Sequence, residues 1–315
     1  MQDKRHLTPM DVFSFRHIAE VQIAPDAGRI CYVLVRRDPT SDQRRSTLLL
    51  SNDRRNWHEV PDSTGCTAPR WAPDSRRLAF FRRAGGRTAL VVHDADTGAQ
   101  HTLIEAAEPM REIAWSPDGR QIAFQMHVEE KPPAWLALPQ APDGATWAPA
   151  FKVTSRLIYR HDSIGDLAEG AYQIFVTDAD GSFTPRAITS GIWVSSFMQP
   201  PGLTWSADGS ELLLAASRDA NWDVAPNEID IHAVRVADGN LRRLTERPGP
   251  EASLAVSPDG NWLAYTGVVD RKLSSQLRRL FVMDTRTGAT HELLADLDRS
   301  IDGVAWRGDS AALFV

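Results

Sequence analysis

Side chains able to bind peptide groups gather between Arg156 and Asp162 of this 315-residue chain. The cluster consists of Arg156, Tyr159, Arg160 and Asp162. A guanidinium can donate two parallel hydrogen bonds to a carboxylate, and a neighbouring phenol adds a further donor. The sequence therefore marks these four residues as substrate-facing candidates that could hold the carbonyls and carboxylates of a peptide. In the alternative interpretation, Arg160 and Asp162 pair with each other and only tie their segment to the rest of the protein.

The residues needed for serine acyl transfer are missing. An α/β-hydrolase presents its nucleophile in a Gly-x-Ser-x-Gly turn, and no such string occurs in the sequence. The nearest serines, Ser182 and Ser210, follow glycines in predicted hairpin turns. We therefore expect no catalytic residue in this chain, and whether the chain belongs to an enzyme is left open at this point.

Metal and cofactor motifs are also absent from the sequence. Asp219-x-Asn221-x-Asp223 starts like a calcium loop, but Val224 and Asp230 stand where glycine and glutamate are required. The two cysteines have no Cys-x-x-Cys or Cys/His spacing for zinc. The prediction is no metal and no cofactor.

Charge and hydropathy exclude two classes of partner. A formal net charge of -6 gives no long-range attraction for nucleic acid. The opening residues lack the apolar stretch of a signal peptide, and the longest plain apolar run, Leu212–Ala216, is too short to span a bilayer. We expect a cytoplasmic location, with neither nucleic acid nor membrane as partner.

The elements that must position the candidate side chains are repeated. One phrase, an apolar stretch, a Pro-Asp-Gly-like turn and a second apolar stretch, occurs six times. Its turn aspartates are Asp26, Asp74, Asp118, Asp208, Asp259 and Asp309. Proline presets the turn, aspartate caps it and glycine closes it. The runs that follow, such as Leu78–Phe81, are too short for helices and apolar on both sides, which predicts strands covered on both faces.

A second hairpin and a closing strand complete each repeat. Leu90–Gly98 and Phe281–Gly288 are examples of this hairpin. Four antiparallel strands joined by tight turns make one blade of a β-propeller. The predicted fold class is therefore all-β, with five full blades and a partial sixth. The aspartates are 48, 44, 90, 51 and 50 residues apart, and the doubled interval predicts an insertion over about residues 128–171 in blade three.

The start of the chain predicts a short helix. Thr8 is a suitable N-cap, Pro9 suits the first helical position and Asp11 suits the first turn. We assign residues 1–20 to a helical segment and residues 21–315 to one propeller domain. The sixth repeat stops after two strands, and a helical segment could not supply the missing ones. We therefore expect an open ring and a truncated chain.

The repeat phrase resembles the Tol-type propeller repeat of TolB and of the prolyl oligopeptidase family of serine peptidases. The opening Thr8–Asp11, leading into Ile23–Asp26, is similar to the N-terminus of acylaminoacyl-peptidase-like members. The run Arg156–Gly165 is similar to their Arg-x-x-Tyr-Arg-x-Asp-Gly-x-Gly string and departs from it at Ser163, where glycine is usual. Ser217–Asp223 is similar to their next-blade loop. The likeness covers nearly the whole chain.

The resemblance implies a seven-bladed propeller that caps an α/β-hydrolase domain and restricts entry to short peptides. The catalytic triad of that family lies in the hydrolase domain, which here would follow Val315. The predicted function is thus a non-catalytic gating and substrate-selecting domain of a serine peptidase, with the hydrolase domain and short peptides as partners. The alternative is a free-standing TolB-like propeller that acts as a protein-interaction scaffold. Substrate preference and a homo-oligomeric state are left open.

A second candidate site follows only from the resemblance. In the dipeptidyl-peptidase branch of the family, a glutamate pair of the propeller holds the ammonium group of the substrate through charge-assisted hydrogen bonds. Glu129 and Glu130, at the start of the insertion, are the matching pair. In the alternative interpretation, Glu129 and Glu130 are part of a solvent-exposed loop without a binding role.

Overall fold

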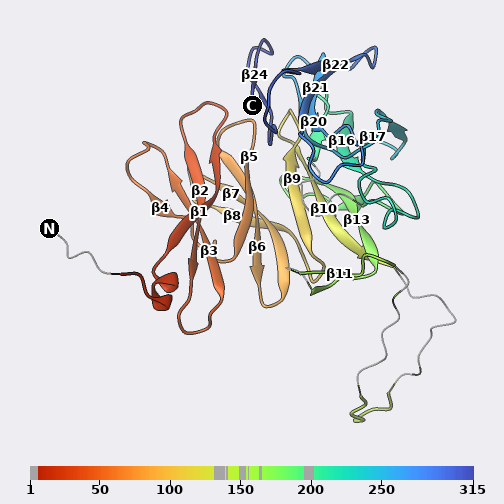
Figure 1. Ribbon diagram of the computed structural model, residues 1–315. Coiled ribbons are helices and arrows are strands. Elements are labelled where there is room, and N and C mark those ends of the chain that lie inside the picture. Colours follow the sequence, from red (N-terminus) through yellow and green to blue (C-terminus); the bar gives the residue numbers. More distant parts are fainter. Residues whose placement is uncertain are drawn as a thin grey trace.

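The computed structural model describes residues 6–130, 139, 141–148, 154, 156–162, 165–194 and 202–315. Five four-stranded antiparallel sheets follow one another along the chain, with a two-stranded sheet after them (Figure 1). The prediction of an all-β propeller with five full blades and a partial sixth is confirmed. No helix among the described residues has the length and apolar character needed to cross a bilayer.

The strands have the following bounds. Blade one consists of β1 (Arg16–Ile23), β2 (Ile30–Arg37), β3 (Arg44–Ser51) and β4 (His58–Glu59). Blade two consists of β5 (Cys66–Trp71), β6 (Arg77–Ala84), β7 (Arg87–Asp94) and β8 (Gln100–Ala106). Blade three consists of β9 (Met110–Trp115), β10 (Gln121–Glu129), β13 (Gly170–Asp178) and β14 (Arg186–Ala187). Blade four consists of β15 (Thr204–Trp205), β16 (Glu211–Ala216), β17 (Asp230–Arg235) and β18 (Leu241–Arg243). Blade five consists of β19 (Glu251–Val256), β20 (Trp262–Gly267), β21 (Arg279–Asp284) and β22 (Thr290–Leu293), and the last sheet consists of β23 (Ala305–Trp306) and β24 (Leu313–Phe314).

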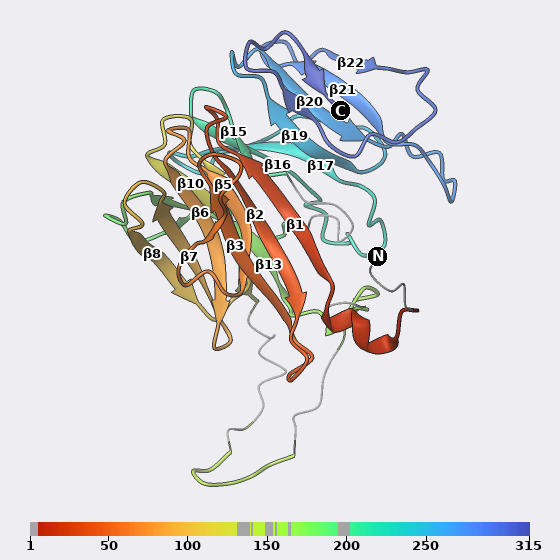
Figure 2. The ribbon, with the colours of Figure 1, turned by 90° about the vertical axis from the view of Figure 1, so that its left-hand side faces the viewer.

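The blades stand side by side in chain order. The first strands of successive blades contact each other, β1 with β5, β5 with β9, β9 with β15, β15 with β19 and β19 with β23. Each first strand is therefore the innermost strand of its blade. Blade five lies apart from blade one in Figure 1, and Figure 2 shows the same blades turned by 90°. The described residues thus form an arc of blades.

Apolar side chains pack between neighbouring blades. One cluster joins blades one and two through residues such as Leu50 and Phe80, and another joins blades four and five through residues such as Leu213 and Leu263. Since each sheet is covered on both faces, its strands are apolar on both sides. This explains the short apolar runs of the sequence.

The repeated turn forms as its sequence predicts. At Asp118, the Oδ1 atom accepts hydrogen bonds from Ser116 Oγ at 2.6 Å and from the Arg120 N–H at 3.0 Å. Gly119 closes the turn with φ +68°, a conformation that glycine adopts without strain. The same carboxylate contacts recur around Asp208. Local side-chain chemistry therefore fixes each turn.

A tryptophan of the repeat ties blades two, three and four and the last sheet to the sheet before them. Indole N–H groups donate to inner-strand carbonyl oxygens in four pairs: Trp71 to Gln22 at 3.4 Å, Trp115 to Arg70 at 2.9 Å, Trp205 to Ala114 at 3.0 Å and Trp306 to Ala255 at 2.9 Å. The first three of these side chains are buried. Each tie combines a buried aromatic surface with a satisfied polar group.

The N-terminal segment is less helical than predicted. Only η1 (Pro9–Phe13) is helical, as a 3-10 helix, with Asp11 Oδ2 accepting from the Thr8 N–H at 2.6 Å. The expectation of a helical segment over residues 1–20 is wrong for residues 16–20, because the chain is already strand β1 from Arg16. Ladder pairing with β2 over the whole strand overrides the local helix signal.

Blade three carries the long connection. β10 ends at Glu129, β13 begins at Gly170, and the two residues pair directly. Between them, β11 (Arg160–His161) and β12 (Gly165–Asp166) form a small hairpin. We call residues 130–169 the insertion. β10 runs from the Asp118 turn to the insertion, so the blades have an insertion face at one end and a turn face, formed by the aspartate turns, at the other.

Candidate functional site

A cavity of about 250 Å³ lies on the insertion face, between blades three and four. Its wall includes Glu129 and Glu130 from the end of β10, Arg156 from the insertion, Gln173 from β13 and Trp222 from the loop between β16 and β17. The structure thus brings one member of the arginine cluster together with the glutamate pair. One cavity therefore contains residues from both sets of sequence candidates.

Blade four holds Arg156 in place. Its Cζ atom lies 5.6 Å from the centroid of the Trp222 ring, and its Nε lies 3.7 Å from Glu169 Oε2. The next residue, Leu157, donates its backbone N–H to Asp223 Oδ2 at 2.8 Å. Since Trp222 is buried, its ring is a fixed platform for a cation–π contact. The insertion is therefore docked on the neighbouring blade at this point.

The charges around the cavity are mainly negative. Glu129 and Glu130 are exposed at its edge, and Glu130 donates its backbone N–H to the Glu169 carbonyl oxygen at 3.4 Å. Glu129 and Glu130 line the cavity together with Arg156, and Glu169 adds a third carboxylate 3.7 Å from the Arg156 guanidinium. Such a site attracts a cationic group more strongly than an anionic one.

A buried amide forms part of the wall. Gln173 donates from Nε2 to the Gly191 carbonyl oxygen at 2.7 Å, and its Oε1 accepts from Thr189 Oγ1 at 2.8 Å. Both ends of the amide are therefore occupied, which fixes its orientation. Ile192 and Val194 add apolar surface beside it. The arrangement can bind and orient a peptide end, but the described residues of its wall include no serine or cysteine nucleophile.

The other three arginine-cluster residues lie outside this wall. Tyr159 is half exposed, and its carbonyl oxygen accepts from the Leu167 N–H at 2.8 Å. Arg160 stands opposite Asp166 in the backbone ladder of the β11–β12 hairpin. Arg160 and Asp162 form no ion pair within the part of the insertion that the structure describes. Ser163, where the sequence departs from the family string, is outside the described residues. A peptide-binding role for Tyr159, Arg160 and Asp162 stays a prediction.

An aromatic stack supports the cavity from blade four. Arg218 Cζ lies 4.4 Å from the centroid of the Trp193 ring, and the ring of His232 packs edge-on against Trp193 at 5.6 Å between centroids. Burial lowers the pKa of His232 to about 4, and the charges of Arg218 and Arg243 contribute to the same direction. The imidazole is therefore neutral at pH 7 and acts as packing.

Sequence reasoning missed two residues of the site. Trp222 stands inside the loop Ser217–Asp223, which the family resemblance singled out, but the string gives no sign that its ring faces Arg156. Gln173 lies in strand β13, and nothing in the surrounding sequence marks it as a residue of a site. Across the described residues, no group of three or more His, Cys, Asp or Glu side chains is arranged to hold a metal ion.

Two curated proteins resemble the chain over most of its length, whereas no family model matches it. Dipeptidyl-peptidase 5 from Porphyromonas gingivalis is 25% identical over 320 aligned residues, which cover 98% of the chain and 46% of that protein. The uncharacterized peptidase YuxL from Bacillus subtilis is 26% identical over 267 residues, which cover 84% of the chain and 31% of that protein. The chain therefore spans less than half the length of these relatives.

Solved structures have the same fold, and a shorter stretch of the sequence resembles TolB. Acylaminoacyl peptidase from Pyrococcus horikoshii superposes with a TM-score of 0.67 at 16% identity, covering 93% of the chain and 42% of that structure. The β-propeller domain of the Trilobed protease from Pyrococcus furiosus gives 0.58 at 16% identity, covering 92% and 74%. The Tol-Pal system protein TolB from Nitrosomonas europaea is 42% identical over 62 residues, which cover 20% of the chain and 15% of that protein.

Proposed function

The chain is a β-propeller homologous to the propeller domains of acylaminoacyl peptidase and dipeptidyl-peptidase 5, with TolB-like repeats, and we propose that it is the non-catalytic, substrate-selecting domain of a serine peptidase. In this proposal an α/β-hydrolase domain follows Val315 and supplies the nucleophile. The length of the relatives supports it, since the chain covers 46% of the first and 31% of the second.

One observation carries the proposal: the docked insertion places Arg156 beside the glutamate pair, between two blades. A ring of blades that caps a hydrolase would restrict entry to short peptides, and this cavity would hold one end of such a peptide. The surplus of carboxylates over guanidinium favours a free α-ammonium group, bound by Glu129 and Glu130. Arg156, docked on Trp222, would then donate to a peptide carbonyl.

The test uses the protein encoded by the whole gene. Its activity is measured with chromogenic dipeptides that have a free amino terminus and with N-acyl aminoacyl reporters. The double variant Glu129→Gln/Glu130→Gln should raise KM for the free-amine substrates roughly tenfold or more, because two charge-assisted hydrogen bonds lose their charge. It should leave the blocked reporters unchanged. Glu105→Gln, on the exposed edge of blade two, is the matched control.

Two results would contradict the proposal at different levels. A gene without a Gly-x-Ser-x-Gly string after codon 315 would exclude the peptidase and favour the scaffold interpretation. An active peptidase whose double variant affects blocked and free substrates equally would keep the peptidase and remove the role of the glutamate pair. A cytoplasmic location is part of the same proposal and is tested by fractionation of cells that express the protein.

A further inference from the structure

Two hairpins at the insertion face of blades one and two are rich in arginine. The tip of the β2–β3 hairpin is residues 36–45, and the tip of the β6–β7 hairpin is residues 82–87. Together these two segments contain seven arginines and two aspartates. β2 and β6 occupy the place of β10 in their own blades, so both tips lie at the same end of the blades as the insertion (Figure 1). Positive charge is therefore concentrated on one part of the insertion face.

Arginines stand directly opposite each other in the first of these hairpins. Arg36 pairs with Arg45, and Arg37 pairs with Arg44, in the ladder between β2 and β3. Arg16 of β1 pairs with Arg36 in turn. Like charges at directly opposite positions destabilise a sheet. An arrangement that opposes stability is expected where a protein has a functional site.

Four of the arginines face the junction of blades one and two. Side chains two or four positions apart along a strand share a face of the sheet. Each of the four lies two or four positions from a residue of the apolar cluster that fills this junction. The pairs are Arg37 with Val35, Arg44 with Leu48, Arg82 with Phe80 and Arg87 with Ala89. The four arginines therefore lie on the facing surfaces of the two blades, at the insertion-face end of their junction.

A backbone bridge holds the two hairpins together. Gly65 donates its N–H to the Ser46 carbonyl oxygen at 2.9 Å, and its own carbonyl oxygen accepts from the Arg83 N–H at 3.1 Å. The φ of Gly65 is +80°, and a Cβ atom there would lie 2.3 Å from the Arg83 carbonyl oxygen, so the close approach requires glycine. The ends of β3 and β6 that bear Arg44 and Arg82 are thus fixed beside each other.

Two of these four arginines already have carboxylate partners. Arg37 lies 2.9 Å from an aspartate of its own hairpin, and Arg87 lies 2.8 Å from a glutamate of β8. Arg44 and Arg82 form no ion pair with any residue that the structure describes. Arg44 is exposed, and Arg82 is partly buried. Two adjacent guanidinium groups are therefore available to a ligand at this junction.

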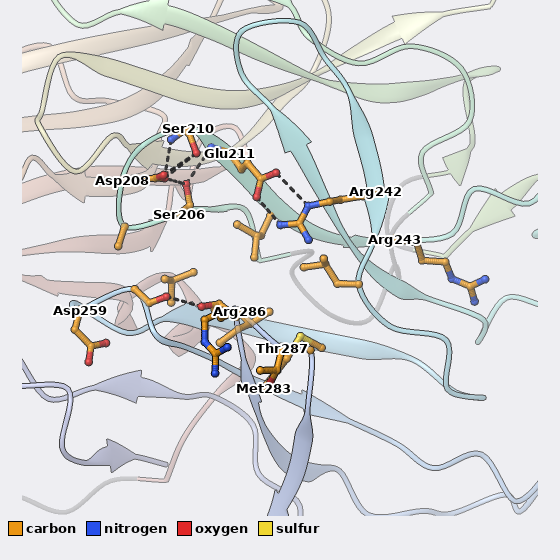
Figure 3. A pocket seen from close by; sticks show the side chains of 18 residues that line it. Ser206, Asp208, Ser210, Glu211, Arg242, Arg243, Asp259, Met283, Arg286 and Thr287 are labelled. Atoms are coloured by element: carbon orange, nitrogen blue, oxygen red, sulfur yellow. Dashed lines mark hydrogen bonds and ion pairs between the residues drawn. The ribbon is translucent and has the colours of Figure 1, made fainter.

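The junction of blades four and five offers a contrast, because Arg242 and Arg243 are paired with acids there. Both line a cavity of about 600 Å³ on the turn face (Figure 3). Arg242 donates to the two carboxylate oxygens of Glu211 at 2.8 and 3.2 Å, and Figure 3 shows these side chains facing each other. The Arg243 guanidinium lies 2.7 Å from Asp230. At the junction of blades one and two, arginines instead outnumber the acids that pair with them.

A short acidic peptide segment fits these charges. A guanidinium group binds a carboxylate through two parallel hydrogen bonds, and arginine clusters recognise acidic motifs in this way. A nucleic acid fits less well, because the chain has a net charge of -6 and two aspartates lie within the first hairpin itself. We propose that Arg44 and Arg82 bind two carboxylates of an acidic peptide segment, with Arg37 and Arg87 adding to the attraction. The proposal does not rest on peptidase activity.

The experiment titrates the 315-residue chain with the peptide acetyl-Gly-Glu-Gly-Glu-Gly-amide, whose ends are blocked, by saturation-transfer NMR at low ionic strength. The same peptide with glutamine in place of glutamate is the uncharged control. The acidic peptide should bind, and the control peptide should not. Arg44→Gln/Arg82→Gln should weaken the binding at least roughly tenfold, because both carboxylates lose their charged donors. Arg55→Gln/Arg286→Gln removes the same charge from exposed positions on the turn face and should leave the binding unchanged.

The proposal is overturned if the acidic and control peptides bind equally well, or if folded Arg44→Gln/Arg82→Gln binds the acidic peptide as well as wild type. A single-stranded oligonucleotide that binds more tightly than the peptide, and loses this binding in the same variant, would overturn it in favour of nucleic acid. Circular dichroism shows whether the double variant folds. If it does not, the exposed Arg44→Gln replaces it. Binding weakened by roughly threefold or more would then support the site, and unchanged binding would reject it.

Discussion

The indole N–H of Trp205 donates to the carbonyl oxygen of Ala114, 3.0 Å away and 91 positions earlier in the chain. The bond joins the inner strands of blades three and four, and the indole ring is buried between them. Ties of this kind recur along the arc, so the stability of the propeller depends on contacts between blades as well as on the sheets.

Loss of this tie should destabilise the protein. Trp205→Ala removes the ring and the donor, and we expect the free energy of unfolding to fall by about 3–5 kcal/mol. Trp205→Phe keeps most of the apolar surface and should cost less, since mainly the hydrogen bond is lost. Trp147→Ala, at a half-exposed position, is the control and should change stability by less than about 0.5 kcal/mol. Urea denaturation measures all three, and equal effects would contradict the assigned role.

A tryptophan added between blades four and five should have the opposite effect. Val256→Trp places an indole at the repeat position of Trp205 and Trp306, where by the same register its N–H would donate to the Thr204 carbonyl oxygen, and we expect the free energy of unfolding to rise by about 1 kcal/mol. A higher midpoint of thermal unfolding in calorimetry checks this. A lower midpoint would mean that the two blades cannot accommodate an indole at this position.

Gly170, where the insertion joins β13, should tolerate no side chain. Its φ is +121°, and a Cβ atom there would lie 2.2 Å from the Val128 carbonyl oxygen. Gly98 also has a positive φ, +74°, but a Cβ atom added to it would have no heavy atom of the surrounding structure within 4 Å. Gly98→Ala should cost about 1 kcal/mol of backbone strain, whereas Gly170→Ala adds a steric clash and should cost several times more. Equal thermal midpoints for the two variants would refute this.

Acidification should destabilise the protein through His232. Its pKa is about 4 in the folded state, mainly because of burial, against 6.5 when exposed. Between pH 6.5 and about 4, His232 is therefore protonated in the unfolded state and neutral in the folded state. The stabilisation is fully present above pH 6.5 and is lost as the pH falls toward 4, by at most about 3 kcal/mol.

The pH dependence can be assigned to this residue by substitution. His232→Asn should flatten the dependence of the free energy of unfolding between pH 6.5 and 4, and the exposed His17→Asn should not. Burial also lowers the pKa of His93, so part of the slope should persist in the first variant. If His232→Asn has the wild-type slope, His232 titrates normally and the assignment is wrong.

Part of the site could be predicted from the sequence. Arg156, Glu129 and Glu130 are candidates because of the types of their side chains and the family resemblance, and all three line one cavity. Tyr159 and Arg160, chosen by the same reasoning, do not. Residue type alone cannot distinguish the side chains that line the cavity from those that do not. The docking of the insertion on blade four decides which of its side chains face the cavity.

The sequence by itself determined the turns, the number of blades and the place of the insertion. These depend on proline, aspartate and glycine within a few positions, and on apolar runs whose pattern is local. Only the tertiary structure decided which distant residues meet. Leu157 bonds to Asp223, 66 positions away, because blade four stands beside blade three. Glu211 pairs with Arg242, 31 positions away, because β16 and β18 flank β17 in the sheet of blade four.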